Sequence, residues 1–367
     1  MDRVRIGIIG FGVMGFNHAR YIFNGTVPGA ELTAVCDINP ERLELAAKEF
    51  GDKVLRFDNP DVFFEKAPID AVMIATVHYT HPELAIKAFQ HGLHVLIEKP
   101  AGVYTKQVKE MNEVAKKSGK VFGIMYNNRT NPLYQKVKDL VSSGELGEIK
   151  RTNWIITTWY RPQAYYDSGG WRGTWEGEGG GVLLNQAPHQ LDLWQWICGM
   201  PVRVRAFCHF GKYHNIEVED DVTAYVEYEN GATGVFITST GETPGTDRLE
   251  IAGDRGKIVV EDNKITFWRL RQSEREINAT AKEMFVNPEC WKCEIPVRGM
   301  TTGHPGITSN WVNAILKGTP LLAPGLEGIN GLEISNAIYL STWLNDWVNI
   351  PVDEDLFYQK LQERIRK

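Results

Sequence analysis

Residues 4–15 read VRIGIIGFGVMG, an apolar run that ends in three glycines with the spacing G-x-G-x-x-G. The run favours a buried strand, and residues 15–23 have the spacing of a helix. In such a unit the first glycine permits a tight turn, the second lets backbone approach a ligand, and the third lets the helix pack on the strand. Because a pyrophosphate binds at the positive end of a helix, the unit predicts a dinucleotide site. The predicted contacts are made by Gly10, Phe11, Gly12, Met14 and Gly15.

The second strand pattern carries an acid at its end. Asp37 follows the apolar residues 30–36 and lies 22 residues after Gly15. A carboxylate at this position accepts a hydrogen bond from the ribose 2′-hydroxyl and repels a 2′-phosphate. The predicted cofactor is therefore NAD rather than NADP. The alternative is a tight turn between strand and helix that binds no ligand.

Strand and helix patterns alternate up to about residue 125. Near-continuous apolar strands separated by amphipathic helices indicate a parallel sheet covered on both faces. The expected further strands are 70–76, 94–100 and 121–127, and the expected helices are 40–50, 81–92 and 105–119. We therefore expect a doubly wound α/β domain over residues 1–125.

Beyond this point strands dominate. The pattern at 221–240 alternates around Asn230-Gly231, which is a strong hairpin signal. We expect residues 126–367 to form an α+β domain with a large, mostly antiparallel open sheet. Because both faces of such a sheet need covering, one is expected to pack on helices and the other on a second subunit, which gives a homo-dimer or homo-tetramer.

Composition narrows the class of partner. The net charge is −6, so no basic surface points to nucleic acid or to an anionic membrane, and no apolar run approaches the roughly 18 residues of a spanning helix. The N-terminal residues enter a strand pattern without a leader, so a cytoplasmic location is expected. Five scattered cysteines do not suggest disulfides, and Cys290-x-x-Cys293 lacks the second pair of a zinc site, so no metal is expected.

Two polar groups interrupt apolar segments. Lys99 follows a buried strand in Glu98-Lys99-Pro100, at the strand end where open α/β sheets bind ligands. Desolvation there lowers a lysine pKa into a useful range, and the ammonium can donate to a substrate hydroxyl. The alternative is a solvated ion pair at a strand end.

The second group lies in LLNQAPHQLDLWQWICGMP, residues 183–201, which otherwise has the pattern of a buried helix. Polar side chains are costly to bury without partners, so a site is expected here. Asn185 and His189 are four residues apart and would share a face of one helix. The alternative is a capping or core histidine. The polar residues are Asn185, Gln186, His189 and Asp192.

Taken together, these motifs resemble the Gfo/Idh/MocA family, the glucose–fructose oxidoreductase and inositol dehydrogenase relatives. The resemblance spans nearly the whole chain and rests on GIIGFGVMG, CDINPER, HPELAIKAFQHGLHVLIEKPAG, YNNRTNP and GGGVLLNQAPHQLDLWQWICGMP. It implies a Rossmann domain followed by an open-sheet domain that provides most of the substrate site and the oligomer contacts.

The resemblance also implies residue roles. Lys99 and His189 match the catalytic lysine and histidine, and Asp192 matches the acid that follows the histidine. Asn185 stands where many relatives have aspartate, so we expect His189 to be a weaker base, with Asn185 binding a substrate hydroxyl. The matching cofactor residues are Thr76, His78 (in place of an asparagine), His81, Glu98 and Asn127.

The segment 154–175 carries seven aromatic residues in 22 positions. Such rings stack on the apolar faces of sugars, and arginines donate to hydroxyls or a carboxylate. Packing of the sheet or a subunit contact is the equally weighted alternative. Substrate binding is predicted for Tyr160, Arg161, Trp171 and Arg172, together with Asn185, Gln186 and His189.

The resulting hypothesis is NAD-dependent oxidation of a ring secondary hydroxyl of a sugar, cyclitol or glycoside, with C3 of a glycoside the preferred position. His189 would take the hydroxyl proton and Lys99 would stabilise negative charge on oxygen. One alternative is a glycosidase that oxidises C3 transiently and eliminates the aglycone, leaving NAD unchanged. Another is a non-catalytic dinucleotide-binding regulator, against which the presence of both Lys99 and His189 argues.

Overall fold

A computed structural model describes residues 2–366 and resolves the chain into two compact units. The first comprises the residues up to Thr130 together with Gly177–Gly179 and Thr301–Leu332, and the second holds the rest. This differs from a single boundary after residue 125. The reason is α11 (Gly303–Lys317), which packs on α1, β1 and β5 although it lies far along the chain.

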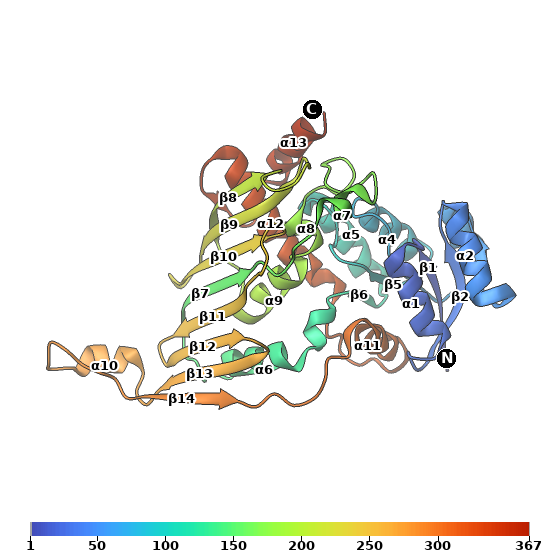
Figure 1. Ribbon diagram of the computed structural model, residues 1–367. Helices are drawn as coiled ribbons and strands as arrows, with labels where there is room; N and C mark the ends of the chain where they lie inside the picture. Colours follow the sequence, from blue (N-terminus) through green and yellow to red (C-terminus); the bar gives the residue numbers. More distant parts are fainter. Residues whose placement is uncertain (1, 367) are drawn as a thin grey trace. The chain divides into compact units, whose positions relative to one another are not determined.

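The first unit contains a six-stranded parallel sheet of order β3-β2-β1-β4-β5-β6 (Figure 1). This order confirms the predicted Rossmann fold. Apart from Arg5 in β1 and His94 in β5, the residues of the central strands β1, β4 and β5 are apolar and buried, because helices cover both faces. The strands are β1 (Val4–Ile9), β2 (Ala30–Cys36), β3 (Leu55–Phe57), β4 (Ala71–Ile74), β5 (His94–Ile97) and β6 (Phe122–Ile124).

The helices of this unit begin where the sequence offers caps. Asn39 and Asn59 accept backbone N–H groups at the starts of α2 and α3, each followed by a proline in the first turn. The β3–α3 pair was not predicted, because three residues are too few to show a pattern. The helices are α1 (Val13–Phe23), α2 (Pro40–Phe50), α3 (Pro60–Lys66), α4 (Thr80–Gln90) and α5 (Thr105–Ser118), with short 3-10 turns at Gly51–Lys53, Asn127–Thr130 and Gly325–Glu327.

The second unit is built on a nine-stranded sheet of order β14-β13-β12-β11-β7-β10-β9-β8-β15. β7 and β10 pair in parallel and the other neighbours pair antiparallel, as the open-sheet prediction required. Gly231 has a φ of 82°, which fits the hairpin predicted between β9 and β10. The strands are β7 (Ile149–Ile156), β8 (Arg203–Phe210), β9 (Glu219–Glu227), β10 (Thr233–Ser239), β11 (Asp247–Gly253), β12 (Gly256–Glu261), β13 (Lys264–Leu270), β14 (Cys290–Ile295) and β15 (Val348–Asn349).

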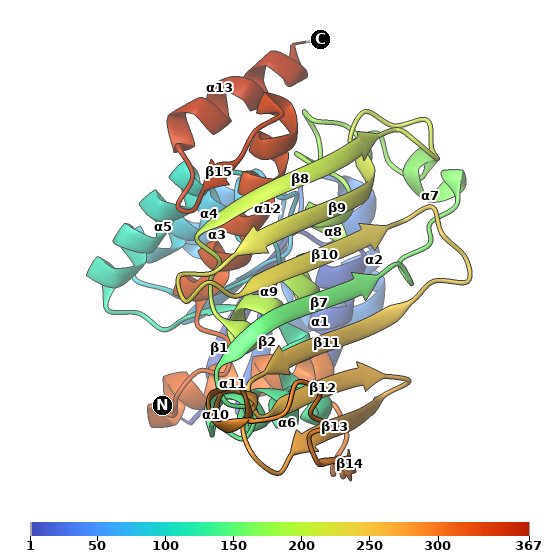
Figure 2. The same ribbon diagram turned by 90° about the vertical axis from the view of Figure 1, so that its left-hand side faces the viewer.

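One face of this sheet is covered by helices of the chain. Trp194 of α9 stacks on Phe236 of β10 and donates from Nε1 to Thr152 of β7. Figure 2 shows the opposite face toward the viewer, with α9 and α12 behind the strands. On that opposite face Phe207 and Tyr225 are exposed. The remaining helices are α6 (Pro132–Ser142), α7 (Gln163–Asp167), α8 (Val182–Asn185), α9 (Pro188–Cys198), α10 (Glu274–Thr280), α12 (Gly328–Leu344) and α13 (Glu354–Ile365).

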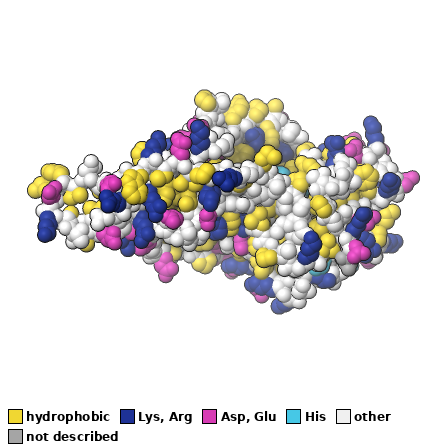
Figure 3. Space-filling view, turned by 90° about the horizontal axis from the view of Figure 1, so that it is seen from below, with side chains coloured by type: hydrophobic (Ala, Val, Ile, Leu, Met, Phe, Trp, Pro, Cys, Tyr) yellow, Lys and Arg dark blue, Asp and Glu magenta, His cyan; other side chains and the backbone are white. Residues whose placement is uncertain are grey.

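The charges on the surface and the apolar character of the helices can be compared with the expectation that the protein binds neither nucleic acid nor a membrane. On the face shown in Figure 3, basic and acidic side chains are interspersed rather than gathered by sign. Within residues 2–366 no helix is both long and apolar enough to cross a bilayer.

Candidate active site

The glycine turn of the first unit has room where a ligand would approach. Gly10 has a φ of 89°, and a Cβ there would lie 2.5 Å from the carbonyl oxygen of Ala75. A Cβ on Gly15 would collide with the carbonyl of Gly10, whereas one on Gly12 would meet nothing within 4 Å. The outer glycines are therefore required by the fold, and Gly12 leaves open the space that backbone contact with a phosphate needs.

The first turn of α1 offers N–H groups to this space. Gly12 is the N-cap and supplies no side chain to accept them, so they are left for an anion. Val13 beside it is 70% exposed, and Met14 is half-buried. Phe11, also predicted to contact the cofactor, is fully buried against Phe16, and its backbone N–H is bound by Asp37.

Asp37 follows β2, where the carboxylate was predicted. Its Oδ2 accepts the backbone N–H of Phe11 at 2.6 Å, and its Oδ1 accepts that of Asn39 at 2.8 Å. The carboxylate thus fastens the glycine turn to the end of β2. It remains half-exposed, next to an Ile38 side chain that is 81% exposed. An exposed apolar side chain beside a carboxylate suits an adenosine, whose base has apolar faces and whose ribose carries hydroxyls.

Two histidines predicted at the cofactor site are buried in the protein. His78 contacts the carbonyl of Glu178 through Nδ1 at 2.9 Å. His81 lies between the carbonyls of Pro100 and Thr76, at 2.8 and 3.1 Å. Burial lowers the pKa of His81, and a neutral imidazole donates to one of these carbonyls only. His81 therefore joins the turn after β4 to the turn after β5, while Thr76 accepts from Thr80 at 2.7 Å.

Glu98 is buried directly after β5 and is held by His18 of α1. His18 Nε2 lies 2.7 Å from Glu98 Oε1, and the backbone N–H of Lys99 donates to Oε2 at 3.1 Å. Burial opposes ionisation of Glu98, but the hydrogen bond and charge of His18, with Lys99 and His304, outweigh it and lower the pKa of Glu98 to about 2. Lys99 itself is half-buried, and its bond to Pro100 is cis. A charged carboxylate thus lies next to the predicted catalytic lysine and favours its ammonium form.

Asn127 begins the turn that follows β6. Within residues 2–366 its buried Oδ1 has no hydrogen-bond partner, so the oxygen is left for a bound group. Arg129, two residues on, serves the fold instead: its fully buried guanidinium donates to Glu327 at 2.6 Å and to the carbonyl of Leu322.

In the second unit, the hydroxyl of Tyr165 gathers several predicted substrate residues. It accepts from Arg172 Nη1 at 2.5 Å, and from the amides of Asn185 and Gln186 at 3.2 Å each. The Arg172 guanidinium lies between two rings, 4.4 Å from the centroid of Tyr165 and 4.5 Å from that of Trp171. We call Tyr165, Trp171, Arg172, Asn185 and Gln186 the Tyr165 cluster.

Arg161 and Tyr160 lie differently. The guanidinium of Arg161 lies over the Tyr165 ring, 5.1 Å from its centroid. Its carbonyl is fixed by His214 Nε2 at 2.7 Å, and His214 is held by Asp220 at 2.9 Å. Tyr160 is 45% exposed, and its backbone carbonyl accepts a hydrogen bond from the Arg161 guanidinium.

The predicted continuous helix over 183–201 is wrong, because two helices meet at Pro188. α8 ends at Asn185 and α9 begins at Pro188, a residue that lacks an N–H and suits a first helical turn. Asn185 and His189 therefore lie on separate helices, and the argument that they share a helix face fails. Asn185 points to Tyr165, while His189 is half-exposed in the first turn of α9. Asp192 is buried and accepts from Gln195.

The start of α8 is fastened by a buried carboxylate that was not predicted. Glu219 accepts the N–H groups of Gly181 and Leu183 at 2.9 Å each, and the hydroxyl of Tyr339 at 2.7 Å. Burial raises the pKa of Glu219 to about 7, although these hydrogen bonds favour its charged form. A Cβ on Gly181 would collide with the carbonyl of Glu219, which explains the glycine run before α8.

Three residues that the sequence analysis did not place in the site are thus central to it: Tyr165, His18 and Glu219. Tyr165 stood in the aromatic segment, but nothing in the pattern distinguished it from its neighbours. His18 and Glu219 act through partners about 80 and 40 positions away. Across residues 2–366 no group of three or more histidine, cysteine or acidic side chains is arranged to hold a metal, and Cys290 and Cys293 are free thiols.

Comparison with known proteins agrees with this arrangement. Residues 4–126 match a family model described as an oxidoreductase family with an NAD-binding Rossmann fold, and residues 134–259 match the GFO/IDH/MocA C-terminal domain. The NAD-binding character predicted from the glycine turn and Asp37 is confirmed.

Among similar proteins are two curated dehydrogenases and one solved structure. The scyllo-inositol 2-dehydrogenase (NAD(+)) of Bacillus subtilis is 27% identical over 70% of this chain and 74% of its own length. The D-glucoside 3-dehydrogenase of Escherichia coli is 29% identical over 62% and 68%. The WlbA dehydrogenase from Bordetella pertussis, solved with NADH and UDP-GlcNAcA, has a TM-score of 0.80 at 28% identity and covers 96% of this chain and all of that one. The chain is an oxidoreductase that belongs to the Gfo/Idh/MocA family.

Proposed function

We propose that this protein oxidises a ring secondary hydroxyl of a carbohydrate with NAD, and that the preferred substrate is a glycoside oxidised at C3. The Tyr165 cluster carries the proposal. Amide and guanidinium donors converge there beside two aromatic rings, which is the combination that binds a sugar by its hydroxyls and its apolar face. The names of the glucoside 3-dehydrogenase and inositol 2-dehydrogenase relatives support the same substrate class.

The first unit fits the cofactor. Gly12 leaves space for a pyrophosphate, and the uncapped N–H groups of α1 supply donors to it. In this proposal Asp37 accepts from the ribose hydroxyls, and the Oδ1 of Asn127, which has no hydrogen-bond partner within residues 2–366, accepts from the carboxamide end. NAD bound there would supply the acceptor for the hydride of the alcohol carbon.

The residues of the chain then manage the proton and the charge on oxygen. In this proposal His189 accepts the hydroxyl proton as general base. Lys99 donates a hydrogen bond to the same oxygen and stabilises its developing negative charge. The ionised Glu98 supports this role, because a neighbouring carboxylate favours the lysine as a cation rather than as a base. Asn185 and Gln186 orient the substrate through their amides.

The open face of the second unit's sheet supports a further part of the proposal, a homo-oligomer. Phe207, Ile237 and Ile155 lie in one cross-strand row, and they alternate along their strands with the buried Ala206, Phe236 and Trp154. Phe236 stacks on Trp194 of α9, so the row belongs to the opposite face of the sheet, which is turned toward the viewer in Figure 2. Phe207 is exposed and the two isoleucines are half-exposed. A second copy of the chain would bury this row, as a dimer or a tetramer.

The test is a screen of sugars, cyclitols and glycosides for NADH formation by absorbance, with the position of the new ketone read by NMR. The proposal predicts NADH with a glycoside and a carbonyl at C3. Release of aglycone without NADH would show the elimination chemistry instead. Tight NAD binding with no turnover of any polyol or glycoside would overturn the enzyme assignment.

A further inference from the structure

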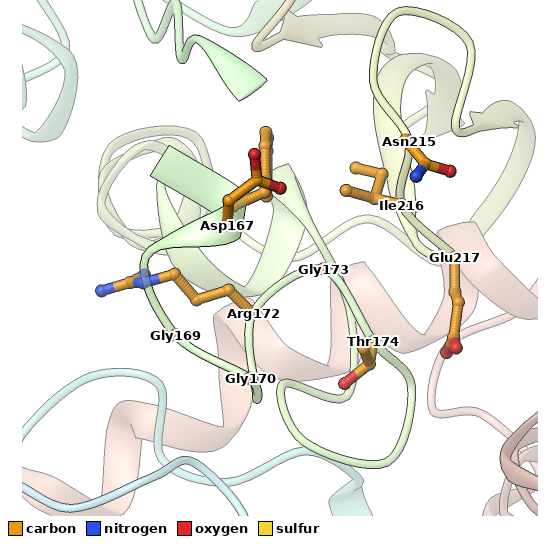
Figure 4. A pocket seen from close by; sticks show the side chains of 10 residues that line it. Asp167, Gly169, Gly170, Arg172, Gly173, Thr174, Asn215, Ile216 and Glu217 are labelled. Carbon is orange, nitrogen blue, oxygen red and sulfur yellow. The ribbon is translucent and has the colours of Figure 1, made fainter. Parts of the chain in front are cut away.

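The second unit contains a cavity of about 390 Å³ next to the Tyr165 cluster (Figure 4). One wall is the end of α7 and the glycine-rich loop after it, which bring Asp167 and Thr174. The opposite wall is the segment before β9, with Asn215, Ile216 and Glu217. This volume lies within the range of small-molecule sites.

The cavity adjoins the Tyr165 cluster through shared elements. Tyr165, Tyr166 and Asp167 are consecutive on α7, and Arg172 lines the cavity while donating to the Tyr165 hydroxyl. Tyr166 is buried and fixed by a hydrogen bond with Thr240 at 2.8 Å, so the shared wall is anchored to the sheet. A molecule bound at the cluster therefore has this cavity as its neighbour.

The polar groups of the cavity have hydrogen-bonding capacity to spare. Asp167 is held through Oδ1 by Gln163 at 3.0 Å, and Glu217 through Oε2 by the N–H of Trp175 at 3.0 Å. The other oxygen of each carboxylate accepts from no group within residues 2–366, so both are available to a ligand. Carboxylates fixed in this way accept well from pairs of neighbouring hydroxyls.

The charge of the cavity selects against anions. The guanidinium of Arg172 is engaged between Tyr165 and Trp171, and Figure 4 shows it directed away from Asp167 and Glu217. Two negative side chains therefore face the cavity, and Arg172 is the one cationic residue among those that line it. A phosphate or a uronate would be repelled.

From these contacts we infer that the cavity binds the second ring of a neutral glycoside, so that the substrate is a disaccharide or a similar extended sugar; this rests on the function proposed above. Asp167 and Glu217 accept from the hydroxyls of that ring, while the Tyr165 cluster holds the ring that is oxidised. A free cyclitol or monosaccharide would leave the cavity unfilled, and the phosphates of a nucleotide sugar would be repelled by the two carboxylates.

The test compares kcat/KM for methyl glucoside with that for a panel of neutral glucose disaccharides, in the wild type and in Asp167→Asn and Glu217→Gln. Both substitutions keep the oxygen that anchors the side chain, so folding is preserved. A lost hydroxyl contact to a charged group costs about tenfold. We expect the best disaccharide to exceed methyl glucoside in the wild type and to lose about tenfold in each variant, with methyl glucoside unchanged. Glu229→Gln is the matched control, because Glu229 is an exposed carboxylate like Asp167 and Glu217 but does not line the cavity.

The outcomes separate this inference from the proposed function. Oxidation of methyl glucoside with no disaccharide preference, or with no effect of either substitution, overturns the subsite and leaves the dehydrogenase proposal standing. Preference for a glucuronide or a phosphorylated sugar also overturns it. Calorimetric titration of each disaccharide in the presence of NADH measures binding to the cavity independently of turnover. An affinity that is reduced in Asp167→Asn and in Glu217→Gln supports the subsite even if nothing is oxidised. The absence of measurable affinity for any disaccharide contradicts it.

Discussion

At the scale of single residues, the hydroxyl of Tyr165 joins the aromatic segment to the polar end of α8. It accepts from Arg172, Asn185 and Gln186, so its loss frees three donors at once. Tyr165→Phe is therefore expected to lower kcat/KM for the sugar by about tenfold or more, since each lost bond to a charged or polar donor is worth about 1 kcal/mol. Steady-state kinetics measure this, and NAD affinity stays unchanged.

Tyr358→Phe, on α13, is the matched control for that experiment. Its side chain is 39% exposed and was not predicted to bind substrate, so the kinetics of this variant should equal those of the wild type. Equal losses in the two variants would mean that the cluster does not bind substrate.

His18 and Glu98 give a pH dependence with a defined sign. Burial opposes ionisation of Glu98, but the hydrogen bond and charge of His18, together with Lys99 and His304, outweigh it and lower the pKa of Glu98 from 4.5 to about 2. A depressed carboxyl stabilises the fold above its unfolded pKa, and this contribution disappears as the pH falls from about 4.5 to about 2. The shift corresponds to about 3 kcal/mol. His18→Leu should remove this acid-sensitive stability, which urea unfolding at a series of pH values measures.

The comparison for His18 is His209, which pairs with Asp221 at an exposed position. An exposed pair is worth at most about 1 kcal/mol, so His209→Leu should leave the acid limb almost unchanged. A His18→Leu protein with the wild-type stability profile below pH 4.5 would contradict the assignment of His18 as the partner that keeps Glu98 ionised.

The glycine turn and the position of Asp37 could be predicted at this scale, and the contacts of the two predicted histidines could not. The glycines and Asp37 follow from local geometry, because each acts within one strand–turn–helix unit. His78 and His81 were predicted at the cofactor, yet the structure shows both buried against carbonyls. A single sequence does not show burial by residues about 20 to 100 positions away.

At the scale of elements, α8 depends on Glu219. The N–H groups of Gly181 and Leu183 donate to different oxygens of Glu219, and a glutamine replaces one of these oxygens with an NH2 that cannot accept. One buried N–H is left unpaired, at a cost of about 1–3 kcal/mol. Glu219→Gln should therefore misplace Asn185 and lower kcat/KM at least tenfold. Calorimetry should find NAD affinity unchanged, since the glycine turn belongs to the other unit.

Glu219 also has the opposite pH signature to Glu98. Its folded pKa is raised to about 7, chiefly by burial, so the folded protein binds the proton more tightly than the unfolded chain does. Stability from this group is present below pH 4.5 and is lost as the pH rises toward 7. Glu219→Gln should flatten the unfolding free energy over this interval, and Glu227→Gln, on the surface, should not. A variant slope equal to the wild-type slope would refute the raised pKa.

Some elements could be predicted from sequence patterns, and others could not. The strands and helices of the Rossmann domain and the hairpin at Gly231 were predicted from periodicity and turn residues. The break between α8 and α9 was missed, because an apolar run that surrounds Pro188 looks the same whether the proline begins a helix or sits inside one. Glu219 of β9 holds the start of α8 in place, but in the sequence this residue is only an acid near the start of a strand.

At the scale of the whole molecule, the exposed row on the open sheet predicts self-association. Ile237→Glu places a charge beside Ile155 and Phe207 in that row. Light scattering after gel filtration should show a dimer or tetramer for the wild type and smaller species for the variant. Leu55→Glu, at an exposed position of β3, is the control and should assemble normally. A wild-type monomer at working concentrations would contradict the oligomer proposal.

The same scale shows what sequence establishes about the fold. The order of strand and helix patterns predicted both sheets, since each pattern depends on neighbouring residues. It did not predict that α11 returns to the first unit, because packing on β1 and β5 leaves no local mark beyond an apolar helix face.

Isotope transfer tests whether the hydride that reduces NAD comes from C3 of a glycoside. Methyl glucoside or the best disaccharide, deuterated at C3 of the oxidised ring, is turned over with NAD, and the reduced cofactor is analysed by mass spectrometry. The account predicts one deuterium in the cofactor and a slowed rate, with neither from substrate deuterated at C2 or C4. Deuterium transferred from C2 or C4 instead, or turnover that leaves the cofactor unlabelled, would contradict it.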